Sequence, residues 1–349
     1  MKPPVFKSGK DLSAKSVFAW RVAQTAVWLV GAVIFFCLLF YPALGITLLW
    51  DVLIPVAPFL FVLSVGLWRN VCPLAITNLL PRRFNVSKKK KMPVLLQSKL
   101  GLISVAALYI IVPLRHAFLN TNGVATALLI LAAVIIGVAM GFVYDWKSGW
   151  CSSLCPIHPV EKLYGGNTLI TLPNAHCDLC VNCSVPCPDS TPNVNPAMVR
   201  KNSYQKISAV LIAGGFPGFV WGWFHVPDLE NIHSVTALAG VYVLPFAGMM
   251  VTLLAYMLIT AIAKAGTERL VINIFAAAAV SCYYWYRIPN LLGFGMFNND
   301  GMLVDLKNSL PEWGITAISL LLVAFFFYWL VIRKENKKSW TIRPAFLQQ

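Results

Sequence analysis

The chain contains an uncharged stretch, VATALLILAAVIIGVAMGFVY, that runs from Val124 to Tyr144. An α-helix needs ~20 apolar residues to cross ~30 Å of hydrocarbon, and this stretch meets that requirement. Seven other apolar stretches have a similar length: Ser16 to Phe40, Asp51 to Trp68, Leu100 to Leu119, Ile207 to Phe224, Val235 to Ala263, Leu270 to Tyr286 and Gly314 to Ile332. We therefore predict an all-α polytopic membrane protein with about eight transmembrane helices, two of which, over 51–68 and 270–286, are marginal in length.

The composition excludes an ordinary water-soluble enzyme. Of 349 residues, 58% are hydrophobic and 12% are charged, and the mean hydropathy is +0.71. A soluble domain carries roughly 25% charged residues. The 22 glycines and 22 prolines are close to average usage, so fibrous and disordered classes are also excluded.

Lysine and arginine are distributed very unevenly between the predicted loops. If the amino terminus is cytoplasmic, 25 of the 28 fall on the cytoplasmic side, and the other side holds Arg115, Arg287 and Lys307. This pattern predicts a multi-pass protein of a prokaryotic inner membrane with both termini in the cytoplasm. The net charge of +15 then marks a membrane face, where the run from Arg82 to Lys91 meets anionic lipid, and does not indicate a nucleic-acid partner.

Seven of the nine cysteines fall in segments that we place in the cytoplasm, and the other two, Cys37 and Cys282, lie inside predicted spans as packing residues. The cytoplasm is reducing, so metal ligation is expected in place of disulfides. The run from Cys177 to Pro188 reads C-x2-C-x2-C-x3-C-P, which is the bacterial ferredoxin spacing. It predicts a [4Fe-4S] cluster, because zinc sites usually pair C-x2-C knuckles across a longer loop.

The ligand assignment leaves alternatives open. In two-cluster ferredoxins the fourth cysteine of such a run ligates the other cluster, so we prefer Cys177, Cys180 and Cys183 with Cys155 as the fourth ligand. A second cluster would use Cys187 and Cys151, with Cys72 as the weakest candidate. Two clusters need eight ligands, so the second site either takes a substitute or is absent; the substitutes in the sequence are Asp145, His158 and His176.

The chain divides into three regions on this basis. Residues 1–144 form a four-helix membrane region with paired hairpins, 145–205 a small cytoplasmic ferredoxin-like iron–sulfur region, and 206–349 a second four-helix membrane region with a basic tail. The first region contains an internal repeat, because the second and fourth spans each end in a Cys-Pro step, at Cys72-Pro73 and Cys155-Pro156.

These motifs, within residues 16–200, resemble the membrane-bound polyferredoxin family typified by NapH and NosR. The resemblance implies a membrane ferredoxin that moves electrons between the quinone pool and redox protein partners. Trp68 stands where the family usually has the first cysteine of its first C-x3-C-P motif. The flavin-attachment signature of the larger relatives is missing, so no flavin is expected.

No haem is expected either, because no histidine lies in the middle of a predicted span. His116, His225 and His233 map to outer span ends, where they could bind copper or line a quinol site with Asp51, Arg115 and Arg287, although interface anchoring is the favoured role. His158 and His176 flank the cysteine motifs and are expected to donate hydrogen bonds to cluster sulfur. Since ~30 Å of hydrocarbon separates the two faces, a quinone is expected near the inner clusters.

We therefore interpret the chain as a [4Fe-4S] electron-transfer protein linking the quinone pool, or a cytoplasmic donor, to a redox partner. An enzymatic role as a quinol-linked oxidoreductase component is left open. Two alternatives are a copper-reducing assembly factor for a respiratory enzyme and a membrane subunit of a larger redox complex.

Overall fold

The computed structural model describes residues 13–145, 147–170, 172, 175–176, 202–229, 234–264, 266–297 and 301–334. Regular structure in these residues is helical, apart from one isolated bridge between Lys90 and Tyr144. The all-α prediction is confirmed for this part of the chain.

The first half contains α-helices and short π-helical turns (η) in this order: α1 Ala14–Phe40, α2 Pro42–Ile46, η1 Thr47–Leu53, α3 Ile54–Val71, α4 Pro73–Asn78, α5 Leu80–Arg83, α6 Val94–Leu114, η2 Arg115–Leu119, α7 Gly123–Val143, η3 Lys147–Leu154 and α8 Ile157–Tyr164. The second half continues with α9 Ser203–Val210, η5 Leu211–Gly215, α10 Phe216–Trp223, α11 Val235–Ile262, α12 Glu268–Leu291, α13 Glu312–Phe327 and η6 Tyr328–Ile332.

Side-chain caps set the start of four of these helices. Ser13 caps α1, Asn122 caps α7, Asn202 caps α9 and Ser234 caps α11. Each cap oxygen accepts a hydrogen bond from a backbone N–H in the first turn, which has no partner inside the helix. The polar residue that closes each loop therefore fixes where the next apolar helix begins.

Six helical segments are long and apolar enough to cross a membrane: Ala14–Phe40, Pro42–Asn78, Val94–Leu119, Gly123–Val143, Val235–Ile262 and Glu312–Ile332. The chain is thus a multi-pass membrane protein by the length and composition of its helices. The two remaining predicted spans, over 207–224 and 270–286, are also helical, as α9 to α10 and as α12, but they are not among the six.

These two segments form the interior of the bundle. Every residue of α10 except Trp221 is buried, and α12 carries ten buried residues, including Arg287. Helix α10 crosses α11 closely, because a Cβ atom on Gly218 would collide with the carbonyl of Gly248, and one on Gly248 with the carbonyl of Gly218. Glycine at both positions lets the two backbones meet, as is common between membrane helices.

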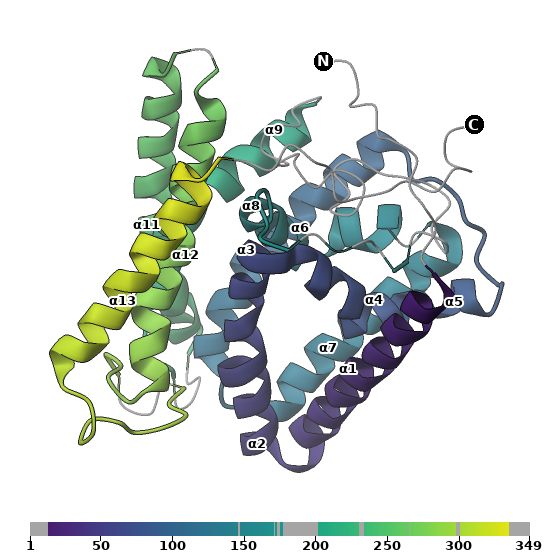
Figure 1. Cartoon of the computed structure of the whole chain (residues 1–349), viewed down its shortest axis with the longest axis horizontal. Coiled ribbons are helices and arrows are strands. Elements are labelled where there is room, and N and C mark those ends of the chain that lie inside the picture. The colour runs from purple at the N-terminus through teal and green to yellow at the C-terminus, as the bar shows by residue number, and fades with distance from the viewer. Residues whose placement is uncertain are drawn as a thin grey trace.

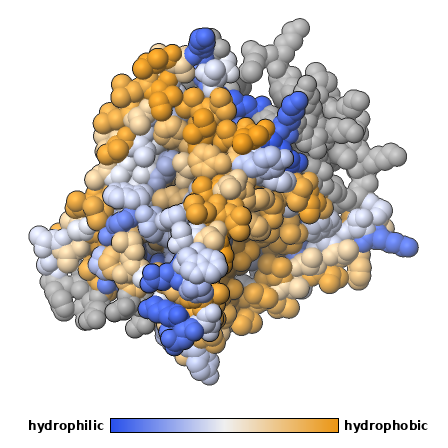
Figure 2. All heavy atoms as spheres, turned by 60° about the vertical axis from the view of Figure 1, so that its left-hand side comes forward, coloured by the Kyte–Doolittle hydropathy of each residue, from blue (hydrophilic) through white to orange (hydrophobic). Residues whose placement is uncertain are grey.

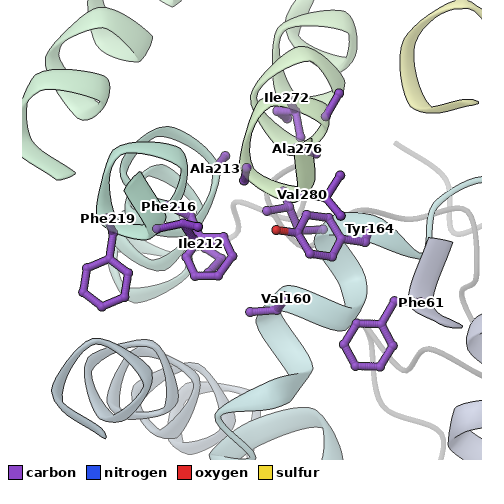
Figure 3. Close-up of a cluster of buried hydrophobic side chains, with 14 of the residues drawn as sticks. Phe61, Val160, Tyr164, Ile212, Ala213, Phe216, Phe219, Ile272, Ala276 and Val280 are labelled. Carbon is purple, nitrogen blue, oxygen red and sulfur yellow. The ribbon is translucent and has the colours of Figure 1, made fainter. Parts of the chain in front are cut away.

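The main hydrophobic core draws on all three regions of the chain (Figure 3). Helix α8 contributes Val160 and Tyr164 to this core. The same core contains residues from three other parts of the fold: Phe61 of α3, Ile212 and Phe216 around η5, and Ile272, Ala276 and Val280 of α12. Helix α8, which begins two residues after Cys155, is therefore packed against the membrane helices.

The outer surface is largely apolar. In Figure 1, α11, α12 and α13 form one group, α1, α4, α5 and α7 lie on the opposite side, and α3, α6 and α8 lie between them. Figure 2 shows hydrophobic side chains spread across the face that carries α11 and α13. Val251, Leu258 and Leu321 are each more than 60% exposed there, at 68%, 63% and 70%. Such a surface is suited to lipid and costly in water.

Candidate functional site

Three of the predicted ligand cysteines gather at one end of the bundle. Cys72 ends α3, Cys151 lies in η3, and Cys155 follows η3 directly. All three pack in one apolar cluster whose buried members are Ala75, Leu79, Trp150 and Cys151. We call this the cysteine end, and it is defined by Cys72, Cys151 and Cys155.

In each of the two Cys-Pro steps the cysteine directly follows a helical segment: Cys72 follows α3, and Cys155 follows η3. A residue before proline is disfavoured in the helical conformation, and Cys72 accordingly leaves the helix with φ −54° and ψ 117°. Its N–H still donates to the Trp68 carbonyl at 2.9 Å. Cys155 is held from both sides: its N–H donates to the Trp150 carbonyl at 3.1 Å, and its carbonyl accepts the Ser104 hydroxyl of α6 at 2.7 Å.

A loop segment runs alongside the second half of α3 toward Cys72. Helix α3 is broken at Ser64, whose φ of −156° and ψ of 76° are not helical, and the Leu63 carbonyl accepts the N–H groups of Leu169 and Ile170. Leu172 then lies against Gly66. The broken helix thus uses the loop to satisfy a backbone group that it cannot satisfy itself.

The same loop segment makes two hydrogen bonds to Asn70 of α3. The Asn70 side-chain oxygen accepts the Ala175 N–H at 2.9 Å, and the Asn70 carbonyl accepts the His176 Nε2–H at 3.1 Å. His176 is buried and immediately precedes Cys177 in the sequence. His176, the residue before the ferredoxin-like run, is therefore hydrogen-bonded to Asn70, which lies two positions before Cys72 in the sequence.

Buried charge at the cysteine end is paired within the chain. Arg69, one turn before Cys72, lies 3.2 Å from the Glu161 carboxylate of α8, with side chains 6% and 2% exposed. Arg82 lies 3.9 Å from Asp145. Asp145, a predicted substitute ligand, is thus part of an ion pair, and His158 is buried on α8.

Burial raises the pKa of the Cys155 thiol to about 12, and the neighbouring Cys72 adds to the rise. Without a bound cation, Cys155 is therefore a neutral thiol at physiological pH. A cysteine ligates a metal as a thiolate, so loading of a metal here would release a proton.

The four cysteines of the run itself, Cys177, Cys180, Cys183 and Cys187, lie outside the described residues. Within the described ranges, no group of three or more His, Cys, Asp or Glu side chains is arranged to hold a metal ion. The cysteine end alone therefore supplies part of a ligand set and not a complete one.

The opposite end of the bundle brings together residues that the sequence placed at outer span ends. Asp51 of η1 pairs with Arg287 of α12, and the Arg115 guanidinium lies over the rings of Trp50 and Trp223. We call this the arginine end, defined by Asp51, Arg115, Arg287, Trp50 and Trp223. Helix α3 lies between the two ends; it is 18 residues long and broken at Ser64, so it spans at most about 27 Å.

Of the three outer histidines, the two that the structure describes, His116 and His225, have separate partners. His116 contacts Asp228 at 2.6 Å and the Trp223 carbonyl at 3.0 Å, whereas His225 donates to the Trp221 carbonyl and stacks on its ring. His233 lies outside the described residues. The sequence analysis did not include Asp228, Trp50 or the Arg69–Glu161 pair. All four residues lie outside the predicted apolar spans, where a charged or aromatic residue is no signal of a site.

No protein-family model matches the chain, and neither the curated proteins nor the solved structures contain a significant match. Its function is therefore argued from its own residues.

Proposed function

We propose that this chain is a membrane-bound [4Fe-4S] electron-transfer protein, similar in plan to the membrane-bound polyferredoxins. The ferredoxin spacing of Cys177, Cys180, Cys183 and Cys187 carries the proposal. The described structure adds support from outside that run, because the other three non-span cysteines, Cys72, Cys151 and Cys155, share one apolar cluster.

The anchoring of His176 is the observation that links these two groups of cysteines. Ala175 and His176 are hydrogen-bonded to Asn70, two positions before Cys72, and His176 directly precedes Cys177 in the sequence. The donor set is also chemically suitable, because thiolates are the ligands of iron–sulfur clusters. Cys155 and Cys177 remain our preferred shared ligands, with Cys72, Cys151 and Cys187 available to a second cluster.

The roles of the surrounding residues follow from their contacts. A bound cluster would supply reversible one-electron chemistry. Burial raises the pKa of the Cys72 thiol, and the Arg69 charge one turn away opposes that rise in part. Ser104 fixes the backbone of Cys155, and Trp150 and Leu79 exclude water from the cysteines. Exclusion of water and fixed hydrogen bonds are the means by which a protein sets a cluster potential.

We further propose that α9 to α10 and α12 add two crossings to the six apolar segments, giving eight. The lysine and arginine distribution then favours a prokaryotic inner membrane with the cysteine end in the cytoplasm. Electron exchange with a quinone or a redox protein would occur at that end, because the candidate ligand cysteines lie there and the arginine end lies beyond the other end of α3.

The test is iron and labile-sulfide analysis of anaerobically purified protein, combined with low-temperature paramagnetic resonance of the reduced sample. We expect about four irons per chain for one cluster or about eight for two, and Cys180→Ser should lose the principal signal. Cys37→Ser in α1 is the matched control and should leave iron content unchanged. Colourless protein, zinc in place of iron, or an unchanged spectrum in Cys180→Ser would contradict the proposal.

A further inference from the structure

The arginine end buries two guanidinium groups that converge on one tryptophan. Arg287 is 1% exposed and donates through Nη2 to the Trp50 carbonyl at 2.8 Å and to the Asp51 carboxylate. Arg115 is 6% exposed, and its guanidinium carbon lies 4.3 Å from the centre of the Trp50 ring and 4.8 Å from that of Trp223. Both indoles are held in place, since Trp50 donates to the Leu119 carbonyl and Trp223 to the Val112 carbonyl.

The two carboxylates of the arginine end, on Asp51 and Asp228, already have partners within the chain. Asp51 pairs with Arg287. Asp228 accepts hydrogen bonds from Asn120 and contacts His116 Nδ1, while His116 Nε2 faces the Trp223 carbonyl. Both ring nitrogens of His116 thus face oxygen atoms, and the Asp228 carboxylate is occupied by His116 and Asn120.

Arg115 is therefore left without an anionic partner in the part of the chain that the structure describes. Its Nε donates to the Asn120 side-chain oxygen at 3.0 Å, and no carboxylate of the described residues lies within ion-pair distance of its Nη atoms. The Tyr283 hydroxyl and Arg287 Nε are buried nearby without a hydrogen-bond partner in the same ranges. Tyr283 is close enough to feel the charge of both arginines.

The donor set specifies the chemistry of a ligand. A guanidinium, a second guanidinium nitrogen and a hydroxyl present N–H and O–H donors, and such a group repels metal cations. Planar guanidinium edges match the oxygens of phosphate and carboxylate groups in pairs. The backbone of Gly301 covers the Arg287–Asp51 pair, because an added Cβ would lie 2.7 Å from both side chains. A ligand would therefore reach the arginine end from the side of Arg115.

We propose that the arginine end binds an oxyanion of the phosphate class, held by the Arg115 guanidinium and the Tyr283 hydroxyl with Arg287 behind them. The phosphate belongs either to a phospholipid headgroup or to a soluble phosphate. This site does not depend on the proposed electron-transfer function, because none of its residues belongs to the cysteine end.

The experiment uses the full-length protein in detergent with two probes. Inorganic phosphate is titrated by calorimetry, and phosphatidylglycerol retention is measured by native mass spectrometry after exchange into a zwitterionic detergent. We expect saturable binding of one probe. Arg115→Gln should weaken it about tenfold or more, as expected for loss of charge-assisted hydrogen bonds. Lys307→Gln, which changes an exposed cation of the segment before α13, should leave it within about twofold.

Tyr283→Phe provides a second variant that keeps the ring and removes only the hydroxyl, in case Arg115→Gln fails to fold. It should weaken binding several-fold. Stoichiometric retention of phosphatidylglycerol without phosphate binding identifies the headgroup as the source, and phosphate binding identifies a soluble anion. Absence of saturable binding of both probes by the unaltered protein, or equal binding by the Arg115→Gln and Lys307→Gln variants, would overturn the proposal.

Discussion

The cysteine end and the arginine end both bury charge, but they balance it differently. At the cysteine end, Arg69 pairs with Glu161 and Arg82 with Asp145, so each buried arginine faces a carboxylate of the same chain. At the arginine end, Arg115 has only an amide and two indole rings among the described residues. The difference lies in the partners of the buried arginines: carboxylates at the cysteine end, and an amide with two indole rings for Arg115 at the arginine end.

The largest loss of stability is expected at the cysteine end, where the buried Arg69 is paired with Glu161. Replacing Glu161 with alanine leaves the Arg69 guanidinium buried without its carboxylate, and breaking one side of a buried pair costs about 3–5 kcal/mol. We expect a strongly lowered midpoint of thermal unfolding, measured by tryptophan fluorescence in detergent.

The double variant Arg69→Met with Glu161→Leu is the matched control. It removes both charges and keeps apolar volume, so it should recover most of the lost stability. If Glu161→Ala alone unfolds at the same temperature as the unaltered protein, the pair does not balance buried charge and the contrast between the two ends is lost.

A smaller effect is expected at the arginine end from Gly301→Ala. Gly301 has a φ of +70°, and an added Cβ would lie 2.7 Å from Arg287 Nη1 and Asp51 Oδ1. Backbone strain and the displaced ion pair together should cost about 1–3 kcal/mol in the free energy of unfolding. Gly166→Ala, where a Cβ meets nothing within 4 Å, should change the unfolding midpoint little. Equal midpoints for the two variants would show that the Gly301 backbone does not cover the pair.

The smallest loss of stability is expected from removing the hydrogen bond that positions Cys155. Ser104→Ala removes the hydroxyl that donates to the Cys155 carbonyl at 2.7 Å, and a typical hydrogen bond contributes about 1 kcal/mol. We expect a slight loss of stability, together with a change in the paramagnetic resonance line shape of the reduced protein. Ser319→Ala, a buried hydroxyl in α13 with no partner in the described ranges, should leave both unchanged. An altered spectrum in Ser319→Ala, or none in Ser104→Ala, would argue against a positioning role.

Apolar length alone was enough to predict most of the long helices. The stretch Val124 to Tyr144 corresponds closely to α7, Gly123–Val143, and 16–40 to α1. The sequence could not distinguish a lipid-facing helix from a core helix, because both are apolar. Helices α10 and α12 therefore read as ordinary spans, although Gly218 and Arg287 are buried inside the bundle.

For the candidate sites, too, the sequence predicted some positions and could not predict others. The shared location of Cys72 and Cys155 followed from two Cys-Pro steps at the ends of successive hairpins, and the structure brings them together. The position of His176 could not be predicted, because it depends on the break in α3 at Ser64 and on Asn70, which are separated from it by about a hundred residues of sequence. Ligand placement by Cys177, Cys180, Cys183 and Cys187 stays a prediction.

The break in α3 has a consequence for how the protein is made. The Leu63 carbonyl receives its hydrogen bonds from Leu169 and Ile170, and the Ser64 hydroxyl contacts a residue 106 positions later in the chain. During synthesis α3 enters the bilayer long before that loop leaves the ribosome, and an unsatisfied carbonyl in hydrocarbon is costly. We therefore expect α3 to insert as a straight helix and to bend only when the loop docks, so the same docking step also brings His176 to Asn70.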